Sequence, residues 1–451
     1  MQPTRFATVS VHISTSSCVP LFLLVLLLVV LAVPLQGGEI RLPSADGPSF
    51  LQLPDVSGPA AEDQGATAGA LPGGTSRDRE GPVESSCRLA QGLTGKGLED
   101  HLYRLEKRMF ADAADGRLDD HSLMEAALIA CGVQHRKQLQ SYLKKFDSLL
   151  DQLYREDEPK ISSTDSPPIA RAQIVFEFMH HHILTGEYSI DCTDLKNTLD
   201  SGRYNCVSAS VLFNCLAERV GLATCGLETT GHAMSRLTWD GGSLDIETTY
   251  PRWFQLIDDP DKRAELVAKA IGRPCDGMDV RIRRVSPTGL VAMIYYNRGI
   301  DLLAKKHFFE AANANAKALR LDAKSTTARG NLLATLNNWA IDLGRSGNYA
   351  QAVGMLKLGM AMDPGYETFT LNYVHVHYQW VEQLCKTGNF EDALKVLATA
   401  ANGKPDHKYF RRAPRDVYRR WNNSLSERRE AENPYLRKAD NTTEKQPSIS
   451  L

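Results

Sequence analysis

The sequence predicts an α+β protein in which a helical leader and a mixed helix–strand domain precede an all-helical repeat array. Apolar residues at helical spacing begin near Leu98. A helix pattern that opens at Cys206 is followed by two strand patterns joined by a turn signal. Beyond residue 290, a motif recurs at an interval of 41 residues. These three observations define the expected fold class.

The composition is that of an ordinary globular protein. The chain has 451 residues, of which 43% are hydrophobic and 24% charged, and this balance excludes a wholly disordered or fibrous chain. Because 52 Lys and Arg nearly balance 54 Asp and Glu, charge predicts no nucleic-acid partner. Nine cysteines without a CxxC spacing indicate neither a disulfide scaffold nor a metal site. We therefore expect no metal and no other cofactor.

An uncharged apolar run, CVPLFLLVLLLVVLAVPL, occupies residues 18–35. It is long for a signal-peptide core and short for a membrane span of about 20 residues. Residues 1–36 are therefore expected to form a cleaved signal peptide or a signal anchor, with a buried core helix as the third alternative. Either of the first two predicts export to a periplasmic or other extracytoplasmic location, and the anchor adds attachment to a membrane. Residues 37–86, rich in Gly, Pro, Ala and Ser, predict a disordered linker.

Three helical patterns form the leader. Their apolar positions run through residues 98–109, 123–130 and 139–153, and Asp115-Gly116 and Gly132 are expected to separate them. Further on, His180, His181 and His182 are consecutive. Neighbouring helical residues point about 100° apart, so the three imidazoles cannot converge on one ion. They are expected to be the polar side of a helix.

The next helix pattern begins with a cysteine. Residues 206–220 form it, Gly221 closes it, and the stripe Cys206, Ser210, Phe213, Ala217 is expected to face inward. A thiol in the first turn lies near the positive end of the helix dipole, which favours the thiolate. Cys206 is therefore a candidate nucleophile.

Two strand patterns carry a candidate base and an acid. His232 opens the first, Asp240-Gly241 is a hairpin turn, and Asp245 lies on the return strand. A two-residue loop pairs Asp245 with Arg236, about 13 Å along the strand from His232. A bulge or an earlier turn is therefore predicted to bring Asp245 opposite the histidine. Without such a shift, Glu247 or a main-chain carbonyl must orient the imidazole.

Each of these residues taken alone is more often structural than catalytic, but together they resemble a known family. A Cys-led helix ending in Ala-Glu-Arg-Val-Gly-Leu, then Gly-His-Ala, then Leu-Asp is similar to the transglutaminase-like branch of the papain-like cysteine hydrolases. The likeness covers residues 170–255 and favours the bacterial subfamily with C-terminal tetratricopeptide repeats. It implies a papain-like, transglutaminase-type domain, assigned with its leader to residues 87–285.

The resemblance also implies roles for individual residues. Cys206 would be the nucleophile, His232 the general base and acid, and Asp245 the group that orients the histidine. The backbone N–H of Cys206 would supply part of an oxyanion hole. In this family, the second donor is a side chain upstream of the cysteine, and Asn205 is the nearest candidate.

Residues 290–425 predict the repeat array. The segments starting at Lys306, Gly347 and Gly388 align at intervals of 41 residues, and so do Leu302, Leu343 and Leu384. The pattern resembles tetratricopeptide repeats, which are helix–turn–helix pairs with a concave surface for an extended peptide. The expected partner is thus a protein or peptide. The aromatic stripe of Trp339, Tyr349 and Trp380 is interpreted as packing between helices.

Arginines alternate with aromatic residues after Lys404, in KPDHKYFRRAPRDVYRRW. This pattern predicts a capping helix with a solvated basic face, and its alternative is binding to an acidic surface or lipid headgroups. Residues 426–451 are expected to form a disordered tail. Among the cysteines, Cys192 could pair locally with Cys225 or Cys275, although disulfides are not expected to organise the fold.

The leading functional hypothesis is thiol-dependent acyl transfer on amide bonds by a cysteine hydrolase or acyltransferase. The enzyme would be a peptidase, an amidase or a transglutaminase-like protein, with the repeats recruiting a protein or peptide partner. The alternative is a non-catalytic interaction scaffold in which the repeats alone are functional.

Overall fold

The computed structural model describes residues 95–162, 166–229, 231–271, 282–404 and 406–432. These residues form an α+β protein with a helical C-terminal region. They divide into two compact units. Unit 1 contains described residues 102–298 and 318–325, and unit 2 contains 95–101, 299–317 and 326–432. The expected signal segment at 1–36 and linker at 37–86 lie outside the described residues.

The leader is helical and breaks at the expected glycines. Its elements are η1 (Gly95–His101), α3 (Arg104–Asp112), η2 (Ala113–Asp115), α4 (Leu123–Ala130) and α5 (Arg136–Ile161). Gly116 and Gly132 follow η2 and α4 with φ of 89° and 91°, a conformation that favours glycine. One expectation was wrong: Leu98 and Met109 do not share one helix, because η1 is a 3-10 turn that belongs to unit 2.

A four-stranded antiparallel sheet is the second part of unit 1. Its strands are β1 (Ala223–Thr229), β2 (His232–Trp239), β3 (Gly242–Ile246) and β4 (Arg283–Val285), in the order β3-β2-β1-β4. Trp239 pairs with Gly242 across a two-residue loop, and Arg236 pairs with Asp245. The predicted hairpin is confirmed, but it has the simple register of a two-residue loop, so the predicted bulge or earlier turn is wrong.

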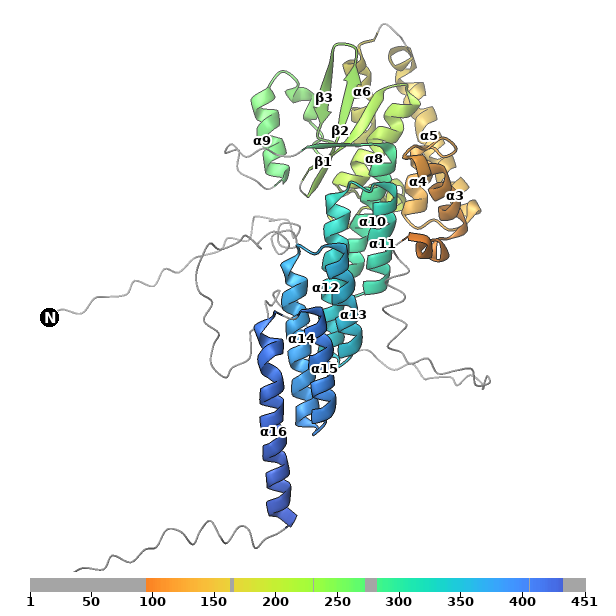
Figure 1. Cartoon of the computed structure of the whole chain (residues 1–451). Coiled ribbons are helices and arrows are strands. Elements are labelled where there is room, and N and C mark those ends of the chain that lie inside the picture. Colours follow the sequence, from red (N-terminus) through yellow and green to blue (C-terminus); the bar gives the residue numbers. More distant parts are fainter. Residues whose placement is uncertain (1–94, 163–165, 230, 272–281, 405, 433–451) are drawn as a thin grey trace, which may run out of the picture. The chain divides into compact units, whose positions relative to one another are not determined.

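Two helices, α6 (Pro168–Phe178) and α8 (Cys206–Arg219), contact this sheet, and α9 (Pro260–Ile271) lies beside it (Figure 1). The same part of the chain contains the π-helical turn η3 (Met179–Ile183), α7 (Leu195–Ser201) and η4 (Trp253–Leu256). Helix α8 contacts β1, β2, α4, α6 and α7. Every residue from 206 to 217 is buried, so the expected single inward stripe was too narrow. Helix α8 is the centre of the unit 1 core.

The repeat helices keep the 41-residue interval along their whole length. They are α10 (Pro287–Ala304), α11 (Phe308–Leu321), α12 (Thr326–Arg345), α13 (Tyr349–Met362), α14 (Glu367–Lys386), α15 (Phe390–Gly403) and α16 (Lys408–Glu432). Helices α11, α13 and α15 start 41 residues apart, and so do α12, α14 and α16. Helix α16 continues through the expected boundary at 425 to Glu432, so the prediction of a disordered tail from residue 426 was wrong for 426–432, and residues 433–451 lie outside the described residues.

The turn inside each helix pair also repeats. The backbone N–H of His307, Asn348 and Asn389 donates to the carbonyl of Leu302, Leu343 and Leu384, at 2.8 to 2.9 Å. The preceding residue is left-handed each time: Gly347 and Gly388 have φ of 79°, and Lys306 has φ of 59°. The stacked leucines of the sequence pattern therefore end each first helix in the same way.

Aromatic pairs link successive repeats. Phe308 stacks on Trp339 at 6.2 Å, Tyr349 on Trp380 at 6.1 Å and Phe390 on Trp421 at 6.0 Å between ring centroids. The interpretation of these rings as packing between helices is confirmed. None of the helices between residues 95 and 432 that the structure describes is both long and apolar enough to cross a membrane.

Candidate functional site

Cys206 is the first residue of α8, as the sequence predicts. Asn205 precedes it as the N-cap, and its side-chain oxygen accepts the backbone N–H of Val207 and Ser208 at 2.9 and 3.0 Å. Ser208 completes a capping box by accepting the backbone N–H of Asn205. These bonds leave the backbone N–H of Cys206 outside the cap, at the positive end of the helix.

Asn205 does not suit the oxyanion role that the resemblance implies. Its side-chain nitrogen donates to the carbonyl of Ile190 at 3.0 Å and to the hydroxyl of Thr193 at 2.7 Å. Both amide hydrogens are used, both cap bonds occupy the oxygen, and the residue is 1% exposed. An oxyanion could reach this amide only by breaking bonds that hold the start of α8.

A buried histidine–carboxylate pair lies at the start of β2. His232 Nε2 is 2.6 Å from Glu247 Oε2, and the two side chains are 5% and 2% exposed. The thiol of Cys206 lies close enough to the imidazole to raise the pKa of His232, through its charge and through hydrogen bonding. Because Nε2 faces the carboxylate, Nδ1 is the nitrogen left for the sulfur. The structure therefore brings the predicted cysteine and histidine together.

Asp245 is not part of this group, so the predicted register shift was wrong. Its carboxylate forms a two-point ion pair with Arg236, which includes a bond of 2.8 Å from Arg236 Nη2 to Asp245 Oδ2. The unshifted hairpin places these residues opposite each other. Glu247, the stated alternative, takes the position beside the histidine. Glu247 lies two residues after Asp245, so its side chain points to the same face of the sheet, and this side chain is longer.

The segment that carries Glu247 is held from three sides. Thr248 Oγ1 is 2.8 Å from Ser210 Oγ on α8, and the Thr248 carbonyl accepts from His180 Nε2 at 3.1 Å. The ring N–H of Trp253 donates to the carbonyl of Asp245 at 3.0 Å. Glu247 Oε1 itself accepts the backbone N–H and the hydroxyl of Thr249 at 2.9 and 2.6 Å. The carboxylate thus has a fixed direction.

The expectation that His180, His181 and His182 form the polar side of a helix was wrong for His180. His181 and His182 are exposed, but His180 lies half-buried against the Glu247 segment. Burial lowers the pKa of His180 to about 4, although the bond to the Thr248 carbonyl opposes the shift. The ring is therefore neutral near pH 7 and can donate its Nε2 hydrogen. No spacing in the sequence indicates this contact, which joins residues 68 apart.

The charges of the pair support each other. Burial lowers the pKa of His232, but the Glu247 carboxylate, Cys206 and their hydrogen bonds raise it well above its ordinary value. Burial raises the pKa of Glu247, but His232 and the bonds from Thr249 bring it below its ordinary value. The favoured state near neutral pH is an imidazolium held by a carboxylate.

Tyr188 completes the group around the sulfur and was not anticipated. Burial raises the pKa of Tyr188, and the neighbouring Cys206 and Glu247 raise it further through their charges, with hydrogen bonding to Cys206 adding to the shift. The residue as a whole is 45% exposed, although its hydroxyl end is buried beside Cys206. An isolated bridge to Tyr204 and an edge-on ring contact at 5.8 Å hold it.

Other cysteines and metal ligands do not form a second centre. Cys131, Cys192, Cys215, Cys225 and Cys385 are free thiols, whereas Cys87 and Cys275 lie outside the described residues. Among the residues that the structure describes, no group of His, Cys, Asp and Glu could hold a metal ion.

No protein-family model, curated protein or solved structure matches this chain. The functional argument therefore depends on the geometry of the site itself.

Proposed function

We propose that unit 1 is a thiol-dependent acyl-transfer centre that acts on amide bonds of a protein or peptide. Cys206 is the nucleophile, His232 the acid and base, and Glu247 replaces Asp245 as the group that orients the histidine. The buried 2.6 Å pair of His232 and Glu247 against the thiol of Cys206 carries this proposal. The helix-borne cysteine and strand-borne histidine also support a papain-like domain of transglutaminase type.

The chemistry follows from the favoured charges. Cys206 reacts as a thiolate, whose proton is held by the His232 imidazolium. Its sulfur attacks the amide carbonyl carbon, and the carbonyl π electrons move to the oxygen. When the C–N bond breaks, the departing amine takes a proton from the His232 imidazolium and a thioester remains. Water or a second amine then attacks the thioester carbon while His232 accepts its proton, and the C–S bond breaks to release the Cys206 thiolate. Glu247 keeps the imidazole in one orientation throughout.

Two donors are suited to the oxyanion. One is the backbone N–H of Cys206, which the Asn205 cap leaves unused. The other is the hydroxyl of Tyr188, which already lies at the sulfur and whose raised pKa keeps it protonated near pH 7. A protonated phenol can donate to developing negative charge. Tyr188 thus takes the upstream position that the resemblance assigned to Asn205.

The second candidate is a non-catalytic scaffold in which the repeats bind a protein. The burial of the thiol favours it, because Cys206 is 9% exposed and His232 is 8% exposed. The half-exposed Tyr188 marks the side from which an acyl group could approach.

Export through residues 18–35 remains part of the proposal and rests on their apolar composition.

Covalent labelling distinguishes the two candidates. The full chain is incubated with a peptide vinyl sulfone, and modified cysteines are identified by mass spectrometry. We expect labelling of Cys206 to be at least 100-fold faster than that of Cys225, the half-buried thiol on β1. His232→Ala should remove most of this difference, because the thiol loses its proton partner.

Controls separate chemistry from unfolding. His121→Ala changes another partly buried histidine, which pairs with Asp112 of the leader at 2.8 Å. It should leave the labelling rate within twofold. Equal, slow labelling of Cys206 and Cys225 in a folded chain would eliminate the acyl-transfer proposal and favour the scaffold.

A further inference from the structure

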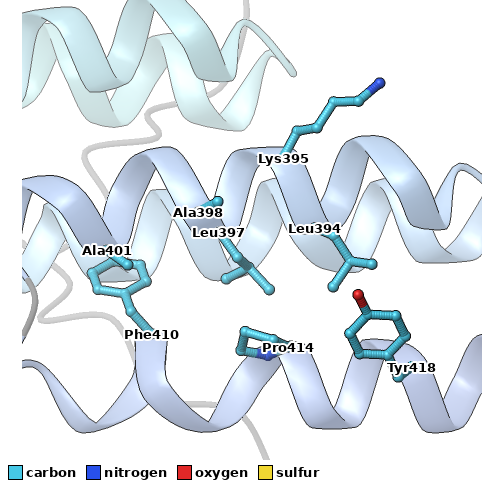
Figure 2. Close-up of a pocket in the computed structure, with 8 residues that line it drawn as sticks. All are labelled: Leu394, Lys395, Leu397, Ala398, Ala401, Phe410, Pro414 and Tyr418. Atoms are coloured by element: carbon cyan, nitrogen blue, oxygen red, sulfur yellow. The ribbon is translucent and has the colours of Figure 1, made fainter.

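An apolar groove lies between the last two helices of the repeat array (Figure 2). It is open to solvent and has a volume of about 410 Å³. Leu394, Leu397, Ala398 and Ala401 line it from α15, and Phe410, Pro414 and Tyr418 line it from α16. Figure 2 shows Leu394 and Leu397 directed toward α16, whereas Lys395 points away. The groove lies in unit 2 and involves no residue of the Cys206 site.

The repeat interval shows what normally covers such a surface. Pro414 and Tyr418 correspond to Tyr373 and His377, which lie 41 residues earlier on α14. Those two residues are only 1% and 2% exposed. Phe410 of the next helix in the series packs against their rings at 6.0 and 5.5 Å. Tyr418, by contrast, is 53% exposed. Helix α16 covers these positions on α14, but no following helix covers the corresponding positions on α16 among the described residues.

The array ends without another helix pair among the described residues. The turn positions Gly347 and Gly388 correspond to Arg429, and α16 continues through it to Glu432. Leu425, which corresponds to the half-buried Leu384, is 43% exposed. The helix therefore keeps the apolar positions of a repeat and omits the turn that would return the chain to cover them.

Charge indicates which kind of helix fits. From Lys408 to Arg420, α16 carries six basic residues and one acidic residue. At 3.6 residues per turn, Arg411, Pro414, Arg415, Tyr418 and Leu425 fall within an arc of about 100°. Cations thus border the open apolar face. This charge disfavours a second copy of the same helix and favours carboxylates.

We propose that this groove binds an amphipathic helix of an acidic partner protein. Its apolar stripe occupies the space beside Pro414 and Tyr418, and its carboxylates face Arg411 and Arg415. The stripe has the spacing that α16 uses on α14, where Phe410, Ala413 and Val417 are buried at i, i+3 and i+7. The partner helix therefore acts as the next member of the array.

A designed peptide tests this proposal. The probe has the sequence of residues 407–421 with Arg411, Arg412, Arg415, Arg419 and Arg420 each replaced by Glu, and it carries a fluorescein label. The control peptide keeps the arginines. We expect saturable binding of the acidic peptide to the full chain in fluorescence anisotropy, at least tenfold tighter than that of the control.

Two pairs of variants locate the binding site. Ala398→Arg places a long side chain in the groove, whereas Thr399→Arg changes an exposed neighbour that does not line it. Arg415→Glu reverses a charge inside the arc that contains the open apolar face. Arg412→Glu reverses a charge outside this arc, about 100° around the helix from Arg411. The first member of each pair should weaken binding at least tenfold, and the second less than twofold. Circular dichroism shows whether each variant is folded.

Several results would overturn the proposal. Binding that Arg412→Glu and Arg415→Glu reduce equally, and that Ala398→Arg leaves unchanged, would show attraction of anions without a helix groove. Equal affinity for both peptides would remove the acidic partner. Phosphatidylserine vesicles that displace the acidic peptide completely, through the same Arg415 dependence, would assign the face to a membrane surface instead.

Discussion

The repeat array and the Cys206 site are built in opposite ways from the same chain. In the array, positions 41 residues apart make the same contact, as Leu302, Leu343 and Leu384 do with the turns that follow them. In the site, each contact occurs once and joins distant segments, as the pair of His232 and Glu247 does. Repetition tolerates local variation, whereas the single site depends on a few buried polar groups.

The largest difference should appear when one carboxylate is neutralised in each of two ion pairs. Glu247→Gln leaves a buried histidine without its anion and should lower the free energy of unfolding by about 3 kcal/mol. Asp245→Asn breaks the partly exposed pair with Arg236 and should cost about 1 kcal/mol or less. Urea denaturation of both variants measures the difference.

The effect of Glu247→Gln should also depend on pH. The raised pKa of His232 gives stability that is complete below about 6.5, its ordinary value, and is lost as pH rises through the folded pKa. The lowered pKa of Glu247 gives stability present above about 4.5, which is lost as pH falls through the folded pKa. The cost of the substitution should therefore be greatest between about pH 4.5 and 6.5. A cost independent of pH would contradict the charged pair.

A smaller difference should separate two helix N-caps. Asn205→Ala removes two cap bonds and two further donor bonds from a buried residue, and should cost about 2 kcal/mol. Asn348 begins the repeat helix α13 without a side-chain cap bond, so Asn348→Ala should cost less than about 0.5 kcal/mol. Thermal denaturation compares the two. Equal costs would mean that the Asn205 network is not stabilising.

The smallest effect should be a gain in stability within the array. Lys306 has φ of 59°, where its counterparts Gly347 and Gly388 have φ of 79°. A left-handed conformation costs a residue with a Cβ about 1–2 kcal/mol, and the greater freedom of glycine in the unfolded chain offsets part of this. Lys306→Gly should thus raise the free energy of unfolding by about 0.5–1 kcal/mol. A loss of stability would show that the side chain contributes more than the strain.

Local patterns predicted most of the fold. The 41-residue interval located the repeat helices, because each pair is closed by its own leucine, turn and aromatic residue. The Asp240-Gly241 signal located the hairpin and its two-residue loop, whereas the shift of register predicted for Asp245 was wrong. The helix start at Cys206 was also readable, since an asparagine precedes it and a serine follows three residues later. That same signal indicates a cap for Asn205 in place of an oxyanion donor.

The site was only partly predictable because its last members depend on tertiary contacts. Asp245 and Glu247 point to the same face of the sheet, so the sequence alone does not distinguish them. Only the observed ion pair with Arg236 shows that Asp245 binds another residue. Greater side-chain length was the one signal in favour of Glu247. Tyr188 reaches Cys206 through an isolated bridge to Tyr204, and no periodic pattern indicates such a contact.

The most direct test of the central claim is the pH dependence of amide cleavage or aminolysis by the full chain, compared between Glu247→Gln and Asp245→Asn. If Glu247 orients and charges His232, Glu247→Gln should lower the rate about 100-fold or more and move the alkaline limb down by about 1–3 pH units. Asp245→Asn should keep the limb of the wild-type protein and a rate within about threefold of it. The opposite pattern, with Asp245→Asn inactive and Glu247→Gln unchanged, would contradict the proposed site.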